Sequence, residues 1–161
     1  RSALARFTGV ERRFQELGRV GGVIVVDDYA HHPTEIRATL AAARAAYAGH
    51  RLVAVFQPHL FTRTRDFATE FGAELAAADA LWLTDVYPAR ELPLPGVSGE
   101  LIVRAAGRAR AAHVEYEPLL ERVPERLSAD LRPGDVVIFM GAGPIDEAAR
   151  ALLQRLSAEA R

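Results

Sequence analysis

Short, fully apolar runs alternate with segments of helical spacing along this chain, and this alternation restricts the fold more than any other feature. The runs Val23–Val26, Leu52–Phe56 and Val136–Met140 are typical of strands buried on both faces of a sheet. Strands that alternate with helices imply crossover connections and a mostly parallel sheet. The remaining pattern predicts strands at 80–84 and 113–116 and helices at 33–48, 66–77, 99–107, 118–131 and 145–156.

The beginning of the chain departs from this rhythm. Residues 1–9 predict the end of a helix that stops at Gly9, and Val10–Leu17 alternates loosely, as a strand does. Glycines at 18, 21 and 22 favour a hairpin-like turn into the first apolar run, which allows an antiparallel first strand. We therefore expect an α/β fold, a three-layer Rossmann-like domain with a mostly parallel sheet, occupying residues 1–161 as one unit.

Composition excludes several classes of protein. The 161 residues carry a formal net charge of −1, so no overall field favours nucleic acid or a membrane surface. Without Lys or Cys, the chain has no P-loop lysine, no thiolate metal site and no disulfide. No apolar run has transmembrane length and no signal peptide is recognisable, which predicts a cytoplasmic location. Since the chain does not begin with Met, we expect it to be part of a longer protein.

Polar residues collect where the predicted strands end. They occupy the segments Asp27–Pro33, Gln57–Arg65, Asp85–Glu91 and Gly141–Gly143. The carboxyl ends of parallel strands open onto one edge of a sheet, and ligands of open α/β folds bind at that edge. The sequence therefore predicts that these four segments form a ligand site.

The polar residues of the first segment allow more than one interpretation. Asp27 and Asp28 can simply end a strand near a helix N-terminus, and His32, held extended by Pro33, can be a packing residue. Together with His31, the same side chains could instead be ligands of a metal-dependent hydrolase. Adjacent histidines point in different directions, so we expect no permanent metal, whereas Mg²⁺ held with substrate phosphates remains compatible with the pattern.

The second and fourth segments carry weaker signals. His59, Arg63 and Arg65 lie in a loop that opens a helix, where the planar forks of the arginines and the helix N-terminus favour an anionic ligand. Of the two arginines, Arg65 fits a merely solvated turn better. The glycines of Gly141–Gly143 are a weak dinucleotide signature, because Asp146 stands where a third glycine is required. They fit better with a turn that runs close to a ligand or a neighbouring strand.

Five motifs occur in an order that is specific to one family. They are Arg12–Gln15, Asp27–Glu35, Phe56–Thr64, Asp85–Glu91 and Met140–Gly143. This order closely resembles the C-terminal domain of the Mur ligase family, and within it the UDP-N-acetylmuramate–L-alanine ligases. The resemblance runs from about residue 7 to the last predicted helix.

The resemblance implies a cytoplasmic enzyme of peptidoglycan synthesis that is built of three domains. The N-terminal domain would bind the UDP sugar, and the central domain would hold ATP through a P-loop together with most ligands of Mg²⁺. ATP would phosphorylate the lactyl carboxylate of UDP-N-acetylmuramate, and the amine of L-alanine would then attack the acyl phosphate. The present chain would be the third domain, folded but inactive on its own.

The resemblance also implies roles for individual residues. Tyr29, His31, His59 and Arg63 match family positions that line the amino-acid pocket. Among these, His31 and His59 would be the catalytic histidines, and Arg63 would suit the alanine carboxylate. Asp28 matches a family position near the nucleotide, and no residue of this domain matches a metal ligand.

Two positions depart from the family pattern. Leu60 stands where the family usually has Arg, so Arg63 or Arg65 would carry more of the carboxylate binding. Pro144 stands where the family commonly has Asp, and Asp146 would partly compensate.

Two alternatives to the alanine-adding ligase remain open. A related ligase that attaches a tripeptide to the same sugar nucleotide shares the pattern of Asp27–Pro33 but departs from Phe56–His59, which favours the alanine enzyme. A Rossmann-like binding module without catalysis is also compatible with the composition.

Overall fold

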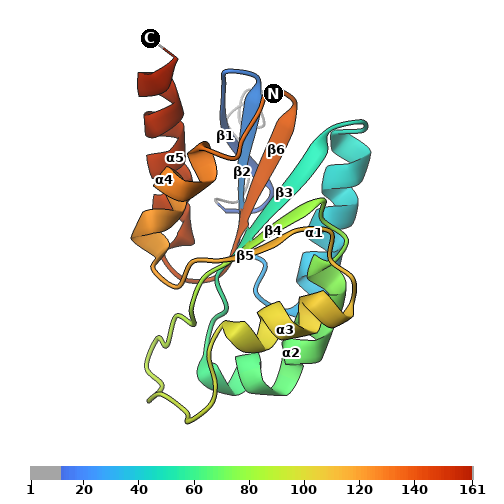
Figure 1. The fold of residues 1–161 in the computed structure, drawn as a ribbon, viewed down its shortest axis with the longest axis vertical. Helices are drawn as coiled ribbons and strands as arrows, with labels where there is room; N and C mark the ends of the chain where they lie inside the picture. The colour runs from blue at the N-terminus through green and yellow to red at the C-terminus, as the bar shows by residue number, and fades with distance from the viewer. Residues whose placement is uncertain (1–11, 161) are drawn as a thin grey trace, which may run out of the picture.

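A computed structural model describes residues 12–160, and its centre is a single twisted sheet (Figure 1). The sheet order is β1-β2-β6-β3-β4-β5. β1 and β2 pair antiparallel, and all other neighbours pair parallel. The expected antiparallel first strand is therefore confirmed. Within the described residues it runs from Gln15 to Val20, beyond the predicted end at Leu17, because the turn is formed by Gly21 and Gly22 while Gly18 lies inside the strand. The strands are β1 (Gln15–Val20), β2 (Val23–Asp28), β3 (Arg51–Phe56), β4 (Ala80–Leu83), β5 (Val114–Tyr116) and β6 (Asp135–Met140).

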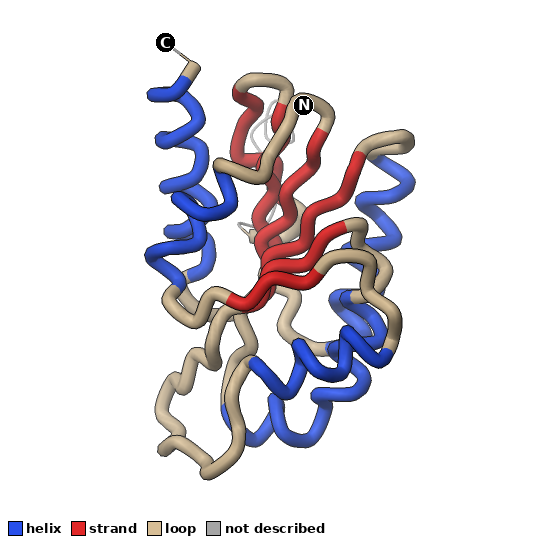
Figure 2. The backbone as a smooth tube through the Cα atoms, viewed as in Figure 1, coloured by secondary structure: helices blue, strands red, loops and turns tan. Residues whose placement is uncertain are grey.

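Helices cover both faces of the sheet, which confirms the expected three layers. One layer holds α1, α2 and α3, and the other holds α4 and α5 (Figures 1 and 2). None of the helices in the described part of the chain is both long and apolar enough to span a bilayer. The helices are α1 (Pro33–Ala46), α2 (Phe61–Leu75), α3 (Glu100–Arg108), α4 (Val123–Ser128), which follows a 3₁₀ turn at Leu120–Arg122, and α5 (Ile145–Glu159).

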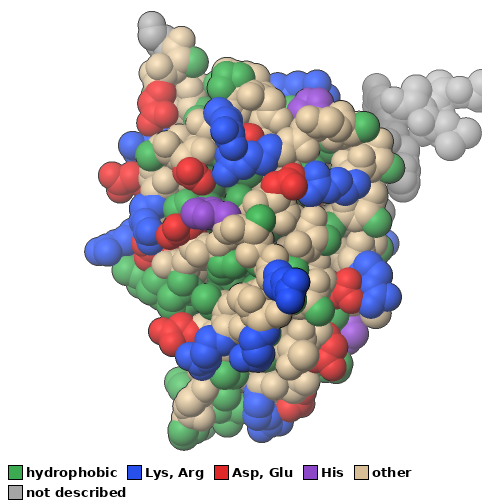
Figure 3. Space-filling view, turned by 45° about the vertical axis from the view of Figure 1, so that its right-hand side comes forward, with side chains coloured by type: hydrophobic (Ala, Val, Ile, Leu, Met, Phe, Trp, Pro, Cys, Tyr) green, Lys and Arg blue, Asp and Glu red, His purple; other side chains and the backbone are tan. Residues whose placement is uncertain are grey.

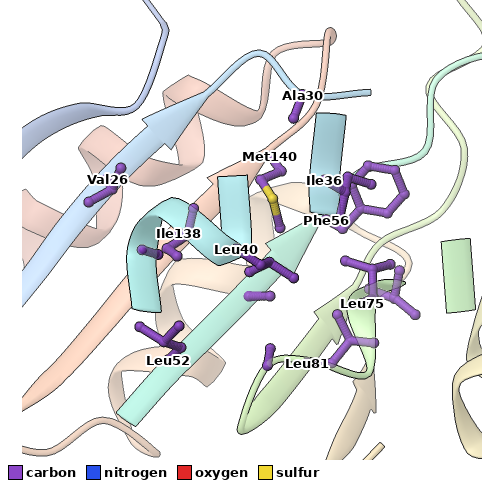
Figure 4. Close-up of a cluster of buried hydrophobic side chains, with 14 of the residues drawn as sticks. Val26, Ala30, Ile36, Leu40, Leu52, Phe56, Leu75, Leu81, Ile138 and Met140 are labelled. Carbon is purple, nitrogen blue, oxygen red and sulfur yellow. The ribbon is translucent and has the colours of Figure 1, made fainter. Parts of the chain in front are cut away.

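Successive side chains along each strand point to opposite faces of the sheet and pack into two separate hydrophobic cores. Ile24 and Val26 join the core beneath α1 to α3, whereas Val23 and Val25 join the core beneath α4 and α5. Figure 4 shows the first core, where residues of α1 and α2 lie over the side chains of β3 and β6. Burial on both faces explains why the strands are continuous apolar runs rather than alternating ones.

Some boundaries differ from those predicted. α2 begins at Phe61 rather than at 66, because Glu91 in the loop after β4 accepts hydrogen bonds from the backbone N–H and the hydroxyl of Thr62. This remote partner replaces a local capping residue, so the sequence pattern could not reveal the helix start. The helix predicted at 118–131 is a 3₁₀ turn followed by the short α4, and the helix end predicted at 1–9 lies outside the described residues.

The position of β6 creates the candidate site. β6 lies between β2 and β3, although it is the last strand of the chain. The chain leaves β2 and β3 towards the α1–α3 layer, and it leaves β6 towards the α4–α5 layer (Figure 1). Such a reversal opens a crevice at the carboxyl ends of the strands, where open α/β sheets bind their ligands.

Candidate functional site

Three loops meet at the carboxyl edge of the sheet. His59, in the loop after β3, forms an isolated parallel bridge with Tyr87, in the loop after β4. Two backbone hydrogen bonds fix this pairing: Tyr87 N–H donates to Pro58 O at 2.8 Å, and Leu60 N–H donates to Tyr87 O at 3.0 Å. The loop after β2 completes the group with Tyr29 and His31.

Aromatic rings from these loops form a continuous row. Ring centroids are 5.2 Å apart for Tyr29 and His31, and 6.1 Å apart for His31 and His59. His59 in turn stacks on Tyr87 at 5.8 Å. The guanidinium of Arg63 lies 3.4 Å from His59 Nδ1. The structure thus brings together all four residues that the resemblance places in the amino-acid pocket.

The surroundings of His59 favour its neutral form. Burial lowers the pKa of His59, and the positive charge of Arg63 lowers it further, as does His31 whenever that ring is protonated. A guanidinium can only donate hydrogen bonds, so its contact requires an unprotonated Nδ1 on His59. The proton of the neutral ring then resides on Nε2.

His31 has the opposite tautomer by the same reasoning. Its Nδ1 lies 2.8 Å from the carbonyl oxygen of Tyr29, which can only accept a hydrogen bond. Nδ1 therefore carries a proton, and Nε2 of the neutral ring is left as an acceptor. The backbone N–H of His31 donates to the carboxylate of Glu35, 2.9 Å away, which fixes this residue at the start of α1. The site thus pairs a histidine that accepts through Nε2 with one that donates through Nε2.

Asp28 stabilises the loop geometry around the site. Its two carboxylate oxygens accept the backbone N–H groups of Phe14 and Ala30, each at 2.7 Å. It also borders a shallow hollow of about 340 Å³, which Arg13, Phe14 and Tyr29 help to line. Asp28 is therefore fixed at the edge of an open surface beside the aromatic row.

Arg12 is the site residue that sequence reasoning missed. Its guanidinium donates to Asp27 Oδ2 at 3.1 Å, to Gly141 O at 2.8 Å and to Gly143 O at 3.1 Å. It also lies over the ring of Tyr29, 5.0 Å from the centroid. Arg12 belongs to a motif that the sequence made recognisable, but local spacing does not point to carbonyl groups at the far end of the chain.

The carboxylate of Asp27 is buried, and its hydrogen-bonding capacity is only partly used. The side chain is fully buried, and Oδ1 has no hydrogen-bond partner in the described part of the chain. Burial raises the pKa of Asp27, and Arg12 opposes this shift. Asp27 therefore acts as the buried counter-ion of Arg12 rather than as an exposed ligand group.

The remaining candidates lie apart from the aromatic row or have other partners. His32 caps α1 and packs edge-on against Phe67, and Arg65 pairs with Asp66. Within the described residues 12–160, no three His, Asp or Glu side chains are grouped as metal ligands. The side chains considered for a metal-dependent hydrolase have separate partners: Asp27 contacts Arg12, Asp28 accepts backbone N–H groups, His31 contacts the carbonyl of Tyr29, and His32 contacts Thr34.

The glycine turn after β6 approaches the loop after β3 closely. A Cβ on Gly141, which has φ of +156°, would lie 2.9 Å from Gln57 O, and one on Gly143 would lie 2.6 Å from Gln57 Oε1. This confirms that the glycines allow a close approach between neighbouring strands.

Charged side chains of both signs are interspersed on the face shown in Figure 3, in keeping with the small net charge.

Comparisons with known proteins show which sequences and structures this chain is similar to. A UDP-N-acetylmuramate–L-alanine ligase from Cutibacterium acnes is 54% identical over 149 residues, which cover 89% of this chain and 31% of that protein. The chain thus spans about a third of the length of its curated relatives.

Solved structures share the fold. The crystal structure of UDP-N-acetylmuramate–alanine ligase MurC from Thermotoga maritima matches with a TM-score of 0.79 and 27% identity, over 95% of this chain and 31% of that one. A MurF ligase from the same organism, in complex with ADP, matches with a TM-score of 0.68 and 21% identity, over 98% and 34%. Residues 12–143 match the family model for the Mur ligase, glutamate ligase domain. This chain therefore belongs to the Mur ligase family and carries its glutamate ligase domain.

Proposed function

We propose that residues 1–161 are the amino-acid-binding C-terminal domain of a cytoplasmic, ATP-dependent ligase that joins L-alanine to UDP-N-acetylmuramate. The observation that carries this proposal is the contact between Arg63 and the neutral His59. His59 lies next to His31 in the aromatic row. These side chains offer a cation for a carboxylate and an acceptor for an amine proton. A free α-amino acid carries these two groups, a carboxylate and an ammonium group, on one carbon atom.

The proposed roles follow from hydrogen-bonding capacity. Arg63 binds the carboxylate of L-alanine, and the Nε2–H of His59 donates to the same group. Nε2 of His31 accepts a proton from the ammonium group, which frees the nitrogen lone pair for attack. The ring of Tyr29 packs beside His31 and borders the small side chain of the substrate.

The reaction that this arrangement serves has two steps. ATP transfers its terminal phosphoryl group to the lactyl carboxylate of UDP-N-acetylmuramate, leaving ADP and an acyl phosphate. The alanine amine, already deprotonated by His31, then forms the amide bond at the acyl carbon, the bond from that carbon to the phosphate oxygen breaks, and inorganic phosphate leaves with the second amine proton.

We place the nucleotide side of the site at Asp28. It borders the hollow beside Arg13, Phe14 and Tyr29, where an aromatic ring and a cation are available to an anionic, planar ligand. The described residues of this domain contain no cluster suited to a metal. Mg²⁺ would be bound with the phosphates mostly by the central domain of the same enzyme, and the UDP sugar by its N-terminal domain.

Product formation by the full-length enzyme tests the proposal. With MgATP, UDP-N-acetylmuramate and L-alanine, we expect phosphate release together with a product heavier by one alanine residue in mass spectrometry. The isolated domain should give no product under the same conditions. Ligation of a tripeptide but not of L-alanine would transfer the assignment to the tripeptide-adding relative. Activity of residues 1–161 alone would contradict the division into domains.

A further inference from the structure

A single guanidinium connects three segments that are distant in sequence. Arg12 precedes β1, Asp27 lies near the end of β2, and the carbonyl groups of Gly141 and Gly143 follow β6. The three hydrogen bonds use Nε and both terminal nitrogens of Arg12, whose side chain is only 19% exposed. A lysine has one nitrogen and no planar fork, so it cannot reproduce this arrangement.

The backbone around Arg12 is fixed in an unfavourable conformation. Arg12 has φ of +60° and Phe14 has φ of +45°, which are uncommon for residues other than glycine. Side-chain acceptors stabilise both positions, since Arg12 N–H donates to Gln15 Oε1 at 3.1 Å and Phe14 N–H donates to Asp28 Oδ2 at 2.7 Å. Backbone strain of this kind persists where the surrounding contacts determine it and is concentrated at functional sites.

The same residue contacts both sides of the candidate site. The carbonyl of Arg12 accepts the N–H of Tyr29 at 2.7 Å, and its guanidinium lies over the ring of that tyrosine. On the other side, it binds the carbonyl of Gly143, and a Cβ on this glycine would lie 2.9 Å from Cγ of Tyr87. Arg12 therefore fixes the two ends of the aromatic row relative to each other.

We propose that Arg12 is a positioning residue for amino-acid binding, which acts through Tyr29 and the glycine turn without touching the substrate. The inference rests on the proposed function, because it assumes that the aromatic row binds L-alanine. Asp27 is the buried counter-ion that keeps Arg12 in place. Displacing reacting groups by about 1 Å can lower rates by as much as about 100-fold, so a remote positioning residue has a measurable effect.

The test compares Arg12→Lys with wild type in the full-length enzyme. We expect the KM for L-alanine to rise by about 10- to 100-fold while the KM for ATP stays near the wild-type value. Arg37→Lys is the matched control, because Arg37 also makes a two-pronged contact with a carboxylate, that of Glu74, but its side chain is exposed on α1. This control should leave both constants unchanged.

A double-mutant cycle separates positioning from a general structural role. If Arg12 acts through Tyr29, Arg12→Lys should raise the KM for L-alanine much less in a Tyr29→Leu background than in wild type. If Arg12→Lys does not fold, Asp27→Asn replaces it in the test, because Asn has the shape of Asp but lacks the charge that holds Arg12. Asp27→Asn should likewise raise the KM for L-alanine and leave the KM for ATP near the wild-type value. Full additivity in the cycle, or a lower melting temperature with an unchanged KM for L-alanine, would overturn the inference.

The outcomes also separate this inference from the proposed function. A wild-type enzyme that does not ligate L-alanine would refute the proposed function itself. An active wild type whose Arg12→Lys and Asp27→Asn variants keep the wild-type KM for L-alanine would refute only the role of Arg12. An equal rise in the KM for ATP would show that Arg12 supports the whole domain rather than the amino-acid pocket.

Discussion

Arg63 is the residue whose charge the proposed binding of L-alanine requires most directly. It lies next to His59, whereas Arg65 pairs with Asp66. Arg63→Ala in the full-length enzyme should therefore raise the KM for L-alanine far more than that for ATP. Loss of a charge-assisted hydrogen bond costs about 1.5–3 kcal/mol, or roughly 10- to 150-fold. Steady-state kinetics with each substrate varied in turn measure the ratio, and equal effects on both would indicate that Arg63 supports domain closure instead.

The ionisation of His59 offers a second test at the level of single residues. Because Arg63 contributes to the lowered pKa of His59, Arg63→Gln should move this pKa up towards its ordinary value of 6.5. Arg65→Gln is the control and should leave it unchanged. NMR titration of the imidazole nitrogens measures the pKa in both variants, and an identical pKa in wild type and Arg63→Gln would contradict this electrostatic coupling.

The lowered pKa of His59 also links stability to pH. The unfolded chain binds more protons than the folded one between the folded pKa and 6.5, so folding is favoured as pH rises through this range. The contribution of His59 is therefore fully present above pH 6.5, and it is lost as pH falls from 6.5 to the folded pKa.

At the level of elements, the N-terminus of α1 depends on a reciprocal cap. Glu35 accepts the backbone N–H groups of His31 and His32, while the ring of His32 accepts the N–H of Thr34. Glu35→Ala should lower the free energy of unfolding by about 0.5–2 kcal/mol, the usual cost of a lost helix cap. Glu35→Gln retains an acceptor oxygen and should cost less. Urea unfolding followed by circular dichroism distinguishes the two variants, and equal losses would show that the charge rather than the cap is responsible.

The packing of α2 on α3 requires a glycine at one position. A Cβ on Gly72 would lie 2.5 Å from the carbonyl carbon and the Cβ of Ala105 in α3. Gly72→Ala should therefore destabilise the fold by about 1–3 kcal/mol through overpacking. Gly107→Ala is the matched change in α3, where nothing lies within 4 Å, and it should stabilise by about 0.4–1 kcal/mol. Thermal unfolding should thus shift in opposite directions, and a Gly72→Ala variant as stable as wild type would contradict the close contact.

At the level of the whole molecule, β6 joins the two halves of the sheet. It pairs with β2 over Ile24–Asp28 and with β3 over Arg51–Phe56. A chain that ends at Gly134 should therefore lose cooperative unfolding, because the hairpin of β1 and β2 is left without a partner strand. A chain that ends at Leu156 lacks only the end of α5 and should still unfold cooperatively. Urea denaturation tests both, and a cooperative transition in the shorter chain would show that the sheet folds without β6.

Local patterns in the sequence determined the elements of this domain and the content of its site. Apolar runs marked the strands, helical spacing marked the helices, and polar residues after the strands marked the edge of the sheet where we propose that a ligand binds. Local patterns placed Tyr29, His31, His59 and Arg63 among the polar residues that follow the strands, and the family resemblance singled them out. The fold brings these four side chains together. Strands, helices and the polar segments between them each depend on residues within a few positions of each other, so they can be predicted from the sequence.

Only the tertiary structure decided which distant groups meet. It placed β6 between β2 and β3, started α2 at Phe61 through Glu91, and joined Arg12 to carbonyl groups 129 and 131 residues away. It also assigned His32 to a helix cap and Asp27 to a buried ion pair. The physical reason is that hydrogen bonds and ion pairs depend on distance in space, and the order of strands in a sheet is not encoded in the periodicity of any one segment.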